Sequence, residues 1–364
     1  MPSASTKPTS PPAPHNCSCG THPWPADFLP FHPRHWLENG HLQTIVGNFL
    51  ARHNDLPPSE RDLIEVSPAH GSQISSQLLC ESHWQPADVR STRPTVILLH
   101  GLEGSSRSQY VIGNANKLWR AGCNTIRMNM RNCGGSEMAT LTPTLYHSGM
   151  SSDVEHVLRF FLARERLTSI SLIGYSMGGN LMLKLVGDLG AAAPPELKCV
   201  IAVSPAADLA VSADALHEWK NRLYERRFLR ALLKRFRRKA TLFPRAFDPN
   251  RATGIHSLRE FDDRIIALYS GFQSASDYYY RAAAARVLDR ITIPTLILHA
   301  CDDPFIRFTP ETRDSMIINP HITLLETAHG GHCAFLAPAD PTTDNDGYWA
   351  EHTNLRFLLA HTKD

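Results

Sequence analysis

Short, continuous apolar runs recur along the chain, separated by segments in which apolar residues fall at helical spacing. Such runs are typical of strands that are buried on both faces of a parallel sheet. We therefore predict strands at residues 95–99, 125–130, 170–174, 199–203, 295–299 and 322–325, and helices at 108–119, 152–163, 177–189, 311–317 and 349–359. This alternation predicts an α/β fold with a doubly wound, mostly parallel sheet.

The alternation is interrupted between residues 205 and 290, where the pattern predicts helices and no comparable strand. We expect a disordered tail over residues 1–29, a first part of the core over 30–204, a helical insertion over 205–290 and the rest of the core over 291–364. Residues 30–50 should form an irregular arm, followed by strands at 63–66 and 74–80 that are joined by a turn at 70–72. Because such sheets bind ligands beyond the carboxyl ends of their strands, the insertion is a candidate lid.

The composition of the 364 residues, with 42% hydrophobic and 20% charged side chains, is that of an ordinary globular protein. A net charge of +2 does not indicate a nucleic-acid partner, and no apolar run approaches the length of a membrane span. The eight cysteines are scattered and indicate no disulfide framework, so the cytoplasm is the expected compartment. Cys17 and Cys19 lie near two histidines, but without a second pair of ligands no metal site is expected.

A candidate nucleophile lies in the sequence Gly-Tyr-Ser-Met-Gly at residues 174–178. By itself, a serine between two glycines is weak evidence. Here a predicted buried strand enters the motif and a predicted helix leaves it, which is the setting of a nucleophile elbow. The tight turn strains the serine backbone, and glycine on either side allows the strand and helix to cross closely. We predict that Ser176 is the nucleophile.

A serine hydroxyl becomes a good nucleophile when a base removes its proton and an acid holds the base in one tautomer. The candidate acids, Asp302 and Asp303, follow the strand predicted at 295–299, and Asp303 is favoured because it adjoins a proline in the turn. The candidate bases, His329 and His332, follow the strand predicted at 322–325. His332 is favoured because two glycines precede it and allow a close backbone approach.

The loop after the strand at 95–99 contains a glycine turn, His-Gly-Leu-Glu-Gly, at residues 100–104. An oxyanion hole in this kind of sheet takes one backbone amide from this loop and one from the residue after the nucleophile. We therefore expect the amides of Leu102 and Met177 to be the oxyanion donors, and His100 to support the loop. No metal or organic cofactor is expected.

Six short motifs together resemble the YheT-like branch of the α/β-hydrolase family: residues 39–44 (NGHLQT), 100–105 (HGLEGS), 146–149 (YHSG), 261–263 (FDD), 277–279 (DYY) and 330–332 (GGH). The resemblance covers the chain from about residue 30 onward. It implies the α/β-hydrolase fold and a triad of Ser176, one aspartate of the 302–303 pair, and His332. Eukaryotic members of the branch act on lipid esters, phospholipids or medium-chain acyl groups and often carry an N-terminal membrane anchor, which is not expected in this sequence.

Residues 222–239 of the predicted insertion hold nine Lys or Arg and one acid, with an apolar stripe at Leu229, Leu232, Leu233 and Phe236. Two interpretations are open: the stripe packs on the body of the protein, or the basic helix rests on an anionic lipid surface.

We expect a carboxylesterase that cleaves a small-molecule ester through an acyl-serine intermediate. An acyltransferase with the same triad and a ligand-binding protein without catalysis are the alternatives, while the sequence gives no expectation for the oligomeric state.

Overall fold

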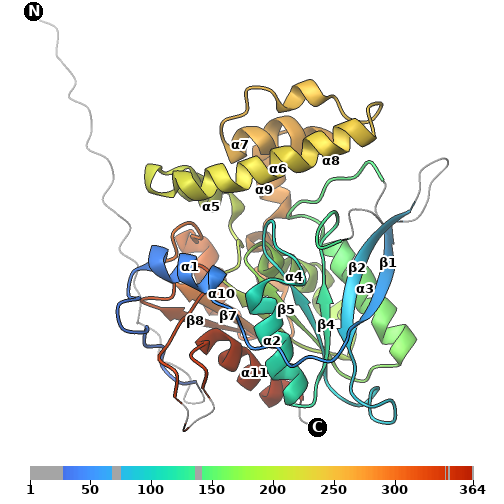
Figure 1. Ribbon diagram of the computed structural model, residues 1–364, viewed down its shortest axis with the longest axis vertical. Coiled ribbons are helices and arrows are strands. Elements are labelled where there is room, and N and C mark those ends of the chain that lie inside the picture. The colour runs from blue at the N-terminus through green and yellow to red at the C-terminus, as the bar shows by residue number, and fades with distance from the viewer. Residues whose placement is uncertain (1–27, 68–74, 136–141, 341, 343–344, 363–364) are drawn as a thin grey trace, which may run out of the picture.

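A computed structural model describes residues 28–67, 75–135, 142–340, 342 and 345–362 (Figure 1). An eight-stranded sheet with the order β1-β2-β4-β3-β5-β6-β7-β8 forms the centre of this part of the chain. The strands β3 to β8 run parallel to one another, whereas β2 pairs antiparallel with both β1 and β4. The doubly wound, mostly parallel sheet predicted from the sequence is confirmed.

The strands agree with the predicted runs to within a few residues. Their bounds are β1 (Glu60–Ser67), β2 (Ser76–His83), β3 (Thr95–Leu99), β4 (Asn124–Met128), β5 (Ile170–Tyr175), β6 (Leu197–Val203), β7 (Thr295–Ala300) and β8 (Ile322–Thr327). Every residue of β3, β4, β5 and β7 is buried, as the continuous apolar runs require. Because β3 to β8 are parallel, their carboxyl ends, and the loops that follow them, meet at one edge of the sheet.

Helices cover both faces of the sheet, and alternate residues of each strand pack against opposite layers. Val96 and Leu98 of β3 belong to the cluster with α2 (Gln109–Arg120) and α11 (Trp349–Thr362). Ile97 and Leu99 face the other layer, which contains α3 (Ser151–Glu165), α4 (Met177–Leu189) and α10 (Pro310–Ile318). This two-sided burial explains why β3 is apolar at every position after Thr95.

Between β6 and β7 the chain forms helices that lie above the carboxyl edge of the sheet (Figure 1). They are α5 (Leu209–His217), α6 (Arg222–Leu242), α7 (Leu258–Phe261), α8 (Leu268–Ser270) and α9 (Ala275–Ala282), with shorter helical turns between them. The apolar stripe of α6 is at most 8% exposed and belongs to the main core cluster. The stripe therefore packs on the body of the protein, whereas contact of the basic helix with an anionic lipid surface stays a prediction.

The expectation of an irregular arm at residues 30–50 is wrong in part, because Gly40–Phe49 forms a helix, α1. Asn39 caps this helix, since its side chain accepts hydrogen bonds from the amides of His41 and Leu42. The buried face of α1 consists of Gly40, Gln43, Thr44 and Gly47 rather than of apolar residues. A pattern search for an apolar stripe misses a helix that packs through small and polar side chains.

The predicted tail, the turn at 70–72 and the Cys17–Cys19 region lie outside the described residues, except for the last two residues of the tail. No helix in the described part of the chain is long and apolar enough to cross a membrane. Cys80, Cys123, Cys133, Cys199 and Cys333 are buried free thiols. Cys301 is disulfide-bonded, which the sequence did not indicate.

Candidate active site

Ser176 lies at a sharp turn between β5 and α4 and has backbone angles φ 54° and ψ −118°. A non-glycine residue in this conformation is strained and persists only when the surrounding structure holds it. The neighbouring glycines permit that structure. A Cβ on Gly178 would lie 2.5 Å from the carbonyl oxygen of His100, and one on Gly174 would lie 2.4 Å from the carbonyl oxygen of Gly178. The helix can start beside the strand only because both positions lack a side chain.

Backbone hydrogen bonds hold the strained serine from both sides. The amide of Ser176 donates to the carbonyl of Val203 at the end of β6 (2.9 Å), and the amide of Ala206 donates to the Ser176 carbonyl (3.2 Å). The Ser176 side chain is only partly buried. Its hydroxyl has no hydrogen-bond partner among the described residues, so it is available to an incoming group.

His332 and Asp303 form a hydrogen-bonded pair at the neighbouring loops. Nδ1 of His332 is 2.8 Å from Oδ2 of Asp303, whose side chain is fully buried. The other carboxylate oxygen of Asp303 accepts hydrogen bonds from the amides of Phe305 (3.1 Å) and Ile306 (2.9 Å). These three donors fix the carboxylate, and the carboxylate in turn fixes the orientation of the imidazole.

The pKa values of both groups are shifted. Burial by itself would raise the pKa of the Asp303 carboxyl, but His332 and the amide donors outweigh burial and hold it below its ordinary value. Burial by itself would lower the pKa of His332, but the neighbouring Cys333 and Asp303 raise it to about 10. The ionised carboxylate next to the ring therefore stabilises the imidazolium that forms when His332 takes a proton.

The competing residues lie elsewhere. Asp302 accepts a hydrogen bond from the Gly331 amide (2.8 Å), and its second oxygen is 3.6 Å from the ring of His329. The His329 ring is 43% exposed, and its Nδ1 is 2.8 Å from the carbonyl oxygen of Glu38. Of the two candidate acids and two candidate bases, the structure brings together Asp303 and His332.

The loop that carries His332 contacts the elbow that carries Ser176. The amide of Cys333 donates to the hydroxyl of Ser204 (3.1 Å), and Sγ of Cys333 is 3.8 Å from the Val203 carbonyl oxygen, the same atom that accepts from the Ser176 amide. Nε2 of His332 is 3.6 Å from Sγ of Cys333. Catalytic hydrogen bonds often form only in the substrate complex, so a reactive arrangement would replace this sulfur contact by one with the Ser176 hydroxyl.

The loop after β3 lies against the serine. A Cβ on Gly101 would be 3.0 Å from Cβ and 3.5 Å from Oγ of Ser176. His100 supports the loop, because its Nδ1 is 2.7 Å from the Gly101 carbonyl and its Nε2 accepts from the Met130 amide (3.1 Å). Burial lowers the pKa of His100 to about 4, so this ring is neutral. The amides of Leu102 and Met177 donate to no acceptor within the described residues, and Met177 is the first residue of its helix.

Two further residues support the site, and the sequence analysis assigned them no role. Oγ1 of Thr44 accepts a hydrogen bond from the His332 amide (2.8 Å) and donates to the Gly40 carbonyl (2.7 Å). The side chain of Gln43 accepts from the Leu336 amide (2.8 Å) and donates back to its carbonyl (3.2 Å). Helix α1 thus holds the histidine loop from a segment far away in the sequence. Both residues belong to the NGHLQT motif at residues 39–44, which in the sequence indicated only a family resemblance.

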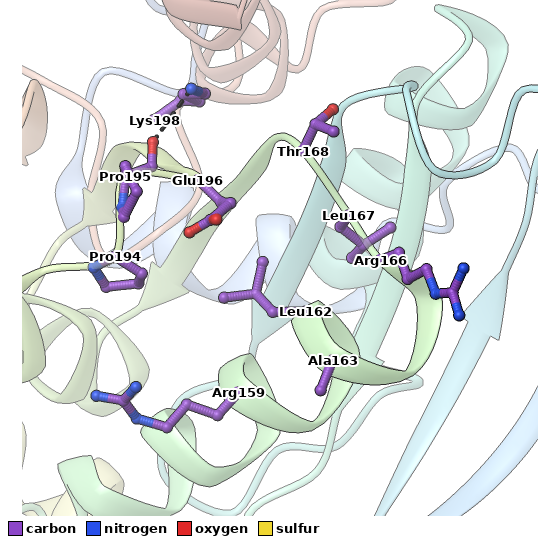
Figure 2. A pocket seen from close by; sticks show the side chains of 10 residues that line it. All are labelled: Arg159, Leu162, Ala163, Arg166, Leu167, Thr168, Pro194, Pro195, Glu196 and Lys198. Atoms are coloured by element: carbon purple, nitrogen blue, oxygen red, sulfur yellow. Dashed lines mark hydrogen bonds between the residues drawn. The ribbon is translucent and has the colours of Figure 1, made fainter.

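A surface hollow of about 760 Å³ lies far from this constellation (Figure 2). It is lined by residues before β5 and around the start of β6, including Arg159, Arg166 and Lys198. Ser176 follows the carboxyl end of β5, so the hollow lies at the opposite edge of the sheet. It takes no part in the site described above.

Comparisons with known proteins agree with the fold described above. The family described as alpha/beta hydrolase fold matches residues 94–338. Similar curated proteins include YheT of Escherichia coli strain K12, which is 29% identical over 85% of this chain and 87% of its own, and the human phospholipase ABHD3, which is 28% identical over 84% and 73%. Monoacylglycerol lipase of Saccharomyces cerevisiae is 27% identical over 88% and 78%.

Solved structures show the same fold at low sequence identity. The 2,6-dihydroxy-pseudo-oxynicotine hydrolase matches with a TM-score of 0.53 at 18% identity, over 89% of this chain and 73% of its own. The Pyrococcus furiosus esterase Pf2001 matches with a TM-score of 0.51 at 15% identity, over 86% and 98%. Since the family match spans well over half of the chain, this protein belongs to the α/β-hydrolase family.

Proposed function

We propose that this protein is a serine hydrolase that cleaves carboxylic esters through an acyl intermediate on Ser176. The observation that carries the proposal is the 2.8 Å pairing of His332 with the buried Asp303, on a loop that contacts the Ser176 elbow. A protein that only bound a ligand would need neither the strained serine nor the oriented imidazole.

In the first half of the reaction, Oγ of Ser176 attacks the ester carbonyl carbon while Nε2 of His332 takes the hydroxyl proton. Asp303 stabilises the resulting imidazolium without taking its proton. The amides of Leu102 and Met177 donate to the carbonyl oxygen as it becomes negatively charged, and the N-terminal end of α4 favours that charge. The C–O bond to the alcohol then breaks, and the alcohol leaves with the proton from His332.

In the second half, water attacks the acyl-serine with the same base and the same oxyanion donors. His332 takes a proton from the water and returns it to Oγ of Ser176, which releases the carboxylic acid. The proton that Ser176 loses leaves with the alcohol and is replaced by one from the water, and no electrons are transferred, so the cycle needs no redox cofactor.

We assign the substrate to short- or medium-chain acyl esters, or lipid-like esters. An aromatic cluster supports this class. The ring of Phe305 lies 4.3 Å from the ring of His332, and Tyr224 and Phe228 of α6 pack on Phe305 with centroid distances of 5.4 and 6.2 Å. The similar proteins named as a phospholipase and a monoacylglycerol lipase act on esters of this kind.

We also infer that the insertion at residues 205–290 acts as a lid over the core formed by residues 30–204 and 291–364. Its support is the position of α5 to α9 beyond the carboxyl edge of the sheet (Figure 1), together with the contact of α6 with Phe305. Because Phe305 contacts both α6 and His332, the position of the lid affects the surroundings of the candidate base.

Reaction with a fluorophosphonate probe tests the nucleophile. The folded wild-type protein should gain one adduct on Ser176, and Ser176→Ala should gain none. Ser152→Ala, which changes an exposed serine at the start of α3, should label like the wild type. A folded wild-type protein that fails to react would favour the alternative of a non-catalytic ligand-binding protein.

Turnover of nitrophenyl esters of increasing acyl length tests the reaction class and the depth of the acyl site together. Acyl transfer to an alcohol remains the second candidate, because the same triad serves both reactions. Product analysis with and without added alcohol separates them: a hydrolase forms mainly free acid in both cases, whereas a transferase forms the new ester.

We propose the cytoplasm as the compartment. Five buried free thiols support it, while the disulfide-bonded Cys301 argues against it. Alkylation of the protein under denaturing conditions, directly on isolation from cells, is the test. Modification of all eight cysteines without prior reduction supports the cytoplasm, and protection of Cys301 until a reductant is added contradicts it.

A further inference from the structure

The outer face of α1, the start of α6 and the helical turn Trp219–Asn221 before it carry large apolar side chains that are left in contact with solvent. Trp219 is 84% exposed, Leu223 82% and Phe49 70%. Leu42 and Ile45 on α1 are each 46% exposed. Exposed apolar residues are common singly, but several on one face indicate an interaction surface.

These side chains belong to one continuous surface. Leu42, Ile45 and Phe49 follow each other at steps of three and four along α1, opposite its buried face. The His41 ring stacks on Tyr224 of α6 at 5.8 Å, and the Arg227 guanidinium lies 5.9 Å from the centre of the Phe49 ring. Figure 1 shows α1 below the end of the insertion where α5 meets α6.

The same face of α6 carries positive charge. Its exposed cations include Arg222, Arg226, Arg227, Arg230, Lys234 and Arg237. Within the described residues, none of these six has a carboxylate within salt-bridge distance, and the one acid of the helix, Glu225, is buried. The buried stripe holds α6 on the protein, so this charge faces away from the body.

We propose that this surface, defined by Leu42, Ile45, Phe49, Trp219, Leu223 and the six cations of α6, docks on an anionic lipid bilayer and brings the candidate active site to ester substrates held in the membrane. The proposal rests on the proposed function for its substrate but not for its binding. The partner is the anionic lipid surface that the sequence already suggested for the basic helix, but other side chains supply the apolar contact, because the stripe of α6 is covered by protein.

The chemistry of the surface selects the partner. Tryptophan, leucine, isoleucine and phenylalanine enter the boundary between headgroups and acyl chains, while arginine and lysine are attracted to anionic headgroups. An acidic protein or a nucleic acid would match the cations but would leave the apolar side chains exposed at the contact. A bilayer satisfies both.

The surface borders the candidate site. Tyr224, which joins α6 to α1, packs on Phe305, and Phe305 packs on His332. A lipid that leaves the bilayer at this surface would therefore enter beside the candidate base rather than cross the aqueous phase.

Sedimentation of the full-length protein with vesicles tests the docking directly. We expect binding to phosphatidylcholine vesicles that contain about one-third phosphatidylserine, and at least about tenfold weaker binding to phosphatidylcholine alone, because each basic residue gains energy only near anionic lipid. The triple variant Arg226→Glu, Arg227→Glu, Arg230→Glu should lose at least about tenfold in binding to the anionic vesicles.

A matched control reverses three cations at the opposite edge of the sheet, Arg159→Glu, Arg166→Glu and Lys198→Glu, around the hollow in Figure 2. This control changes net charge equally and should bind like the wild type. A second variant, Trp219→Ala with Leu223→Ala, removes apolar area without changing charge and should also bind less. Circular dichroism and the hydrolysis of a water-soluble ester should be unchanged in all three, which separates lost docking from lost folding.

Equal binding to neutral and anionic vesicles, no binding to either, or equal losses in the control and the α6 variant would each overturn the proposal. Tighter binding to RNA or to a polyacidic peptide than to anionic vesicles would also overturn it. If the wild type binds vesicles as expected but hydrolyses no ester, the docking surface stands and the proposed function fails.

Discussion

Replacing Asp303 by asparagine should abolish most of the catalysis while leaving the fold intact. The carboxylate accepts from two backbone amides through one oxygen and from His332 through the other. Asparagine can keep its carbonyl oxygen on the two amides. Its NH₂ group then faces Nδ1 of His332 and forces that nitrogen to act as an acceptor, which leaves the proton on Nε2. An Nε2 that already carries a proton cannot take one from Ser176.

The expected loss is about 10⁴-fold in kcat, the effect of this exchange in a serine-protease triad, and corresponds to about 5.5 kcal/mol of transition-state stabilisation. KM should change little, because Asp303 is buried behind the imidazole and is out of reach of the substrate. The assay is steady-state hydrolysis of a nitrophenyl ester, with urea unfolding to show that the variant is folded.

Asp302→Asn is the matched control. Asp302 accepts from the Gly331 amide, a role that the asparagine carbonyl can fill, and it does not touch His332. Its kcat should stay within about tenfold of the wild type. If Asp302→Asn loses as much activity as Asp303→Asn, or if Asp303→Asn keeps more than about a tenth of its activity, the assignment of the acid is refuted.

Three further predictions follow from contacts of the same region. Thr44→Val removes the acceptor of the His332 amide and should lower kcat about tenfold with little change in KM. Thr44→Ser keeps the hydroxyl and should have the kcat of the wild type. An unchanged kcat in Thr44→Val would show that α1 does not position the base. Gly178→Ala should reduce the free energy of unfolding, measured in urea, by about 2–3 kcal/mol, because its Cβ would meet backbone oxygens at 2.5 and 2.7 Å that cannot move aside. The control Gly254→Ala meets nothing within 4 Å but has φ +69°, and it should cost about 1 kcal/mol. In the folded protein the pKa of His332 is raised to about 10. Its contribution to stability is therefore fully present below its unfolded pKa of about 6.5 and is lost as pH rises toward about 10. The free energies of unfolding of wild type and His332→Asn, measured in urea across this pH range, should converge at the alkaline end, and a difference that widens with pH would contradict the sign.

The sequence by itself determined the features that depend on neighbouring residues. A strand buried on both faces needs a continuous apolar run, so β3, β5 and β7 could be located to within a residue or two. The elbow could be predicted for the same reason, because a strand, a Gly-x-Ser-x-Gly turn and a helix lie within about twenty consecutive residues.

The choice between neighbouring candidates could not be made in this way. Asp302 and Asp303 share the same turn, and loop chemistry favoured one only weakly. In the structure, Asp303 is selected because the amides of Phe305 and Ile306 and the ring of His332 converge on it, while Asp302 meets the Gly331 amide. The two amides are local to the turn, but His332 and Gly331 come from a loop about thirty residues away, and no local pattern encodes which aspartate each of them meets.

Helix α1 shows the limit most clearly. Its buried face consists of small and polar residues that bind the histidine loop some 290 residues later in the chain, through Thr44 to His332 and Gln43 to Leu336. Its apolar residues instead face outward beside the cations of α6. Local periodicity shows which residues can be buried, but only tertiary contacts decide what they are buried against. For this reason the contact of Thr44 with the loop of His332, and the exposed apolar face of α1, could be found only in the folded chain.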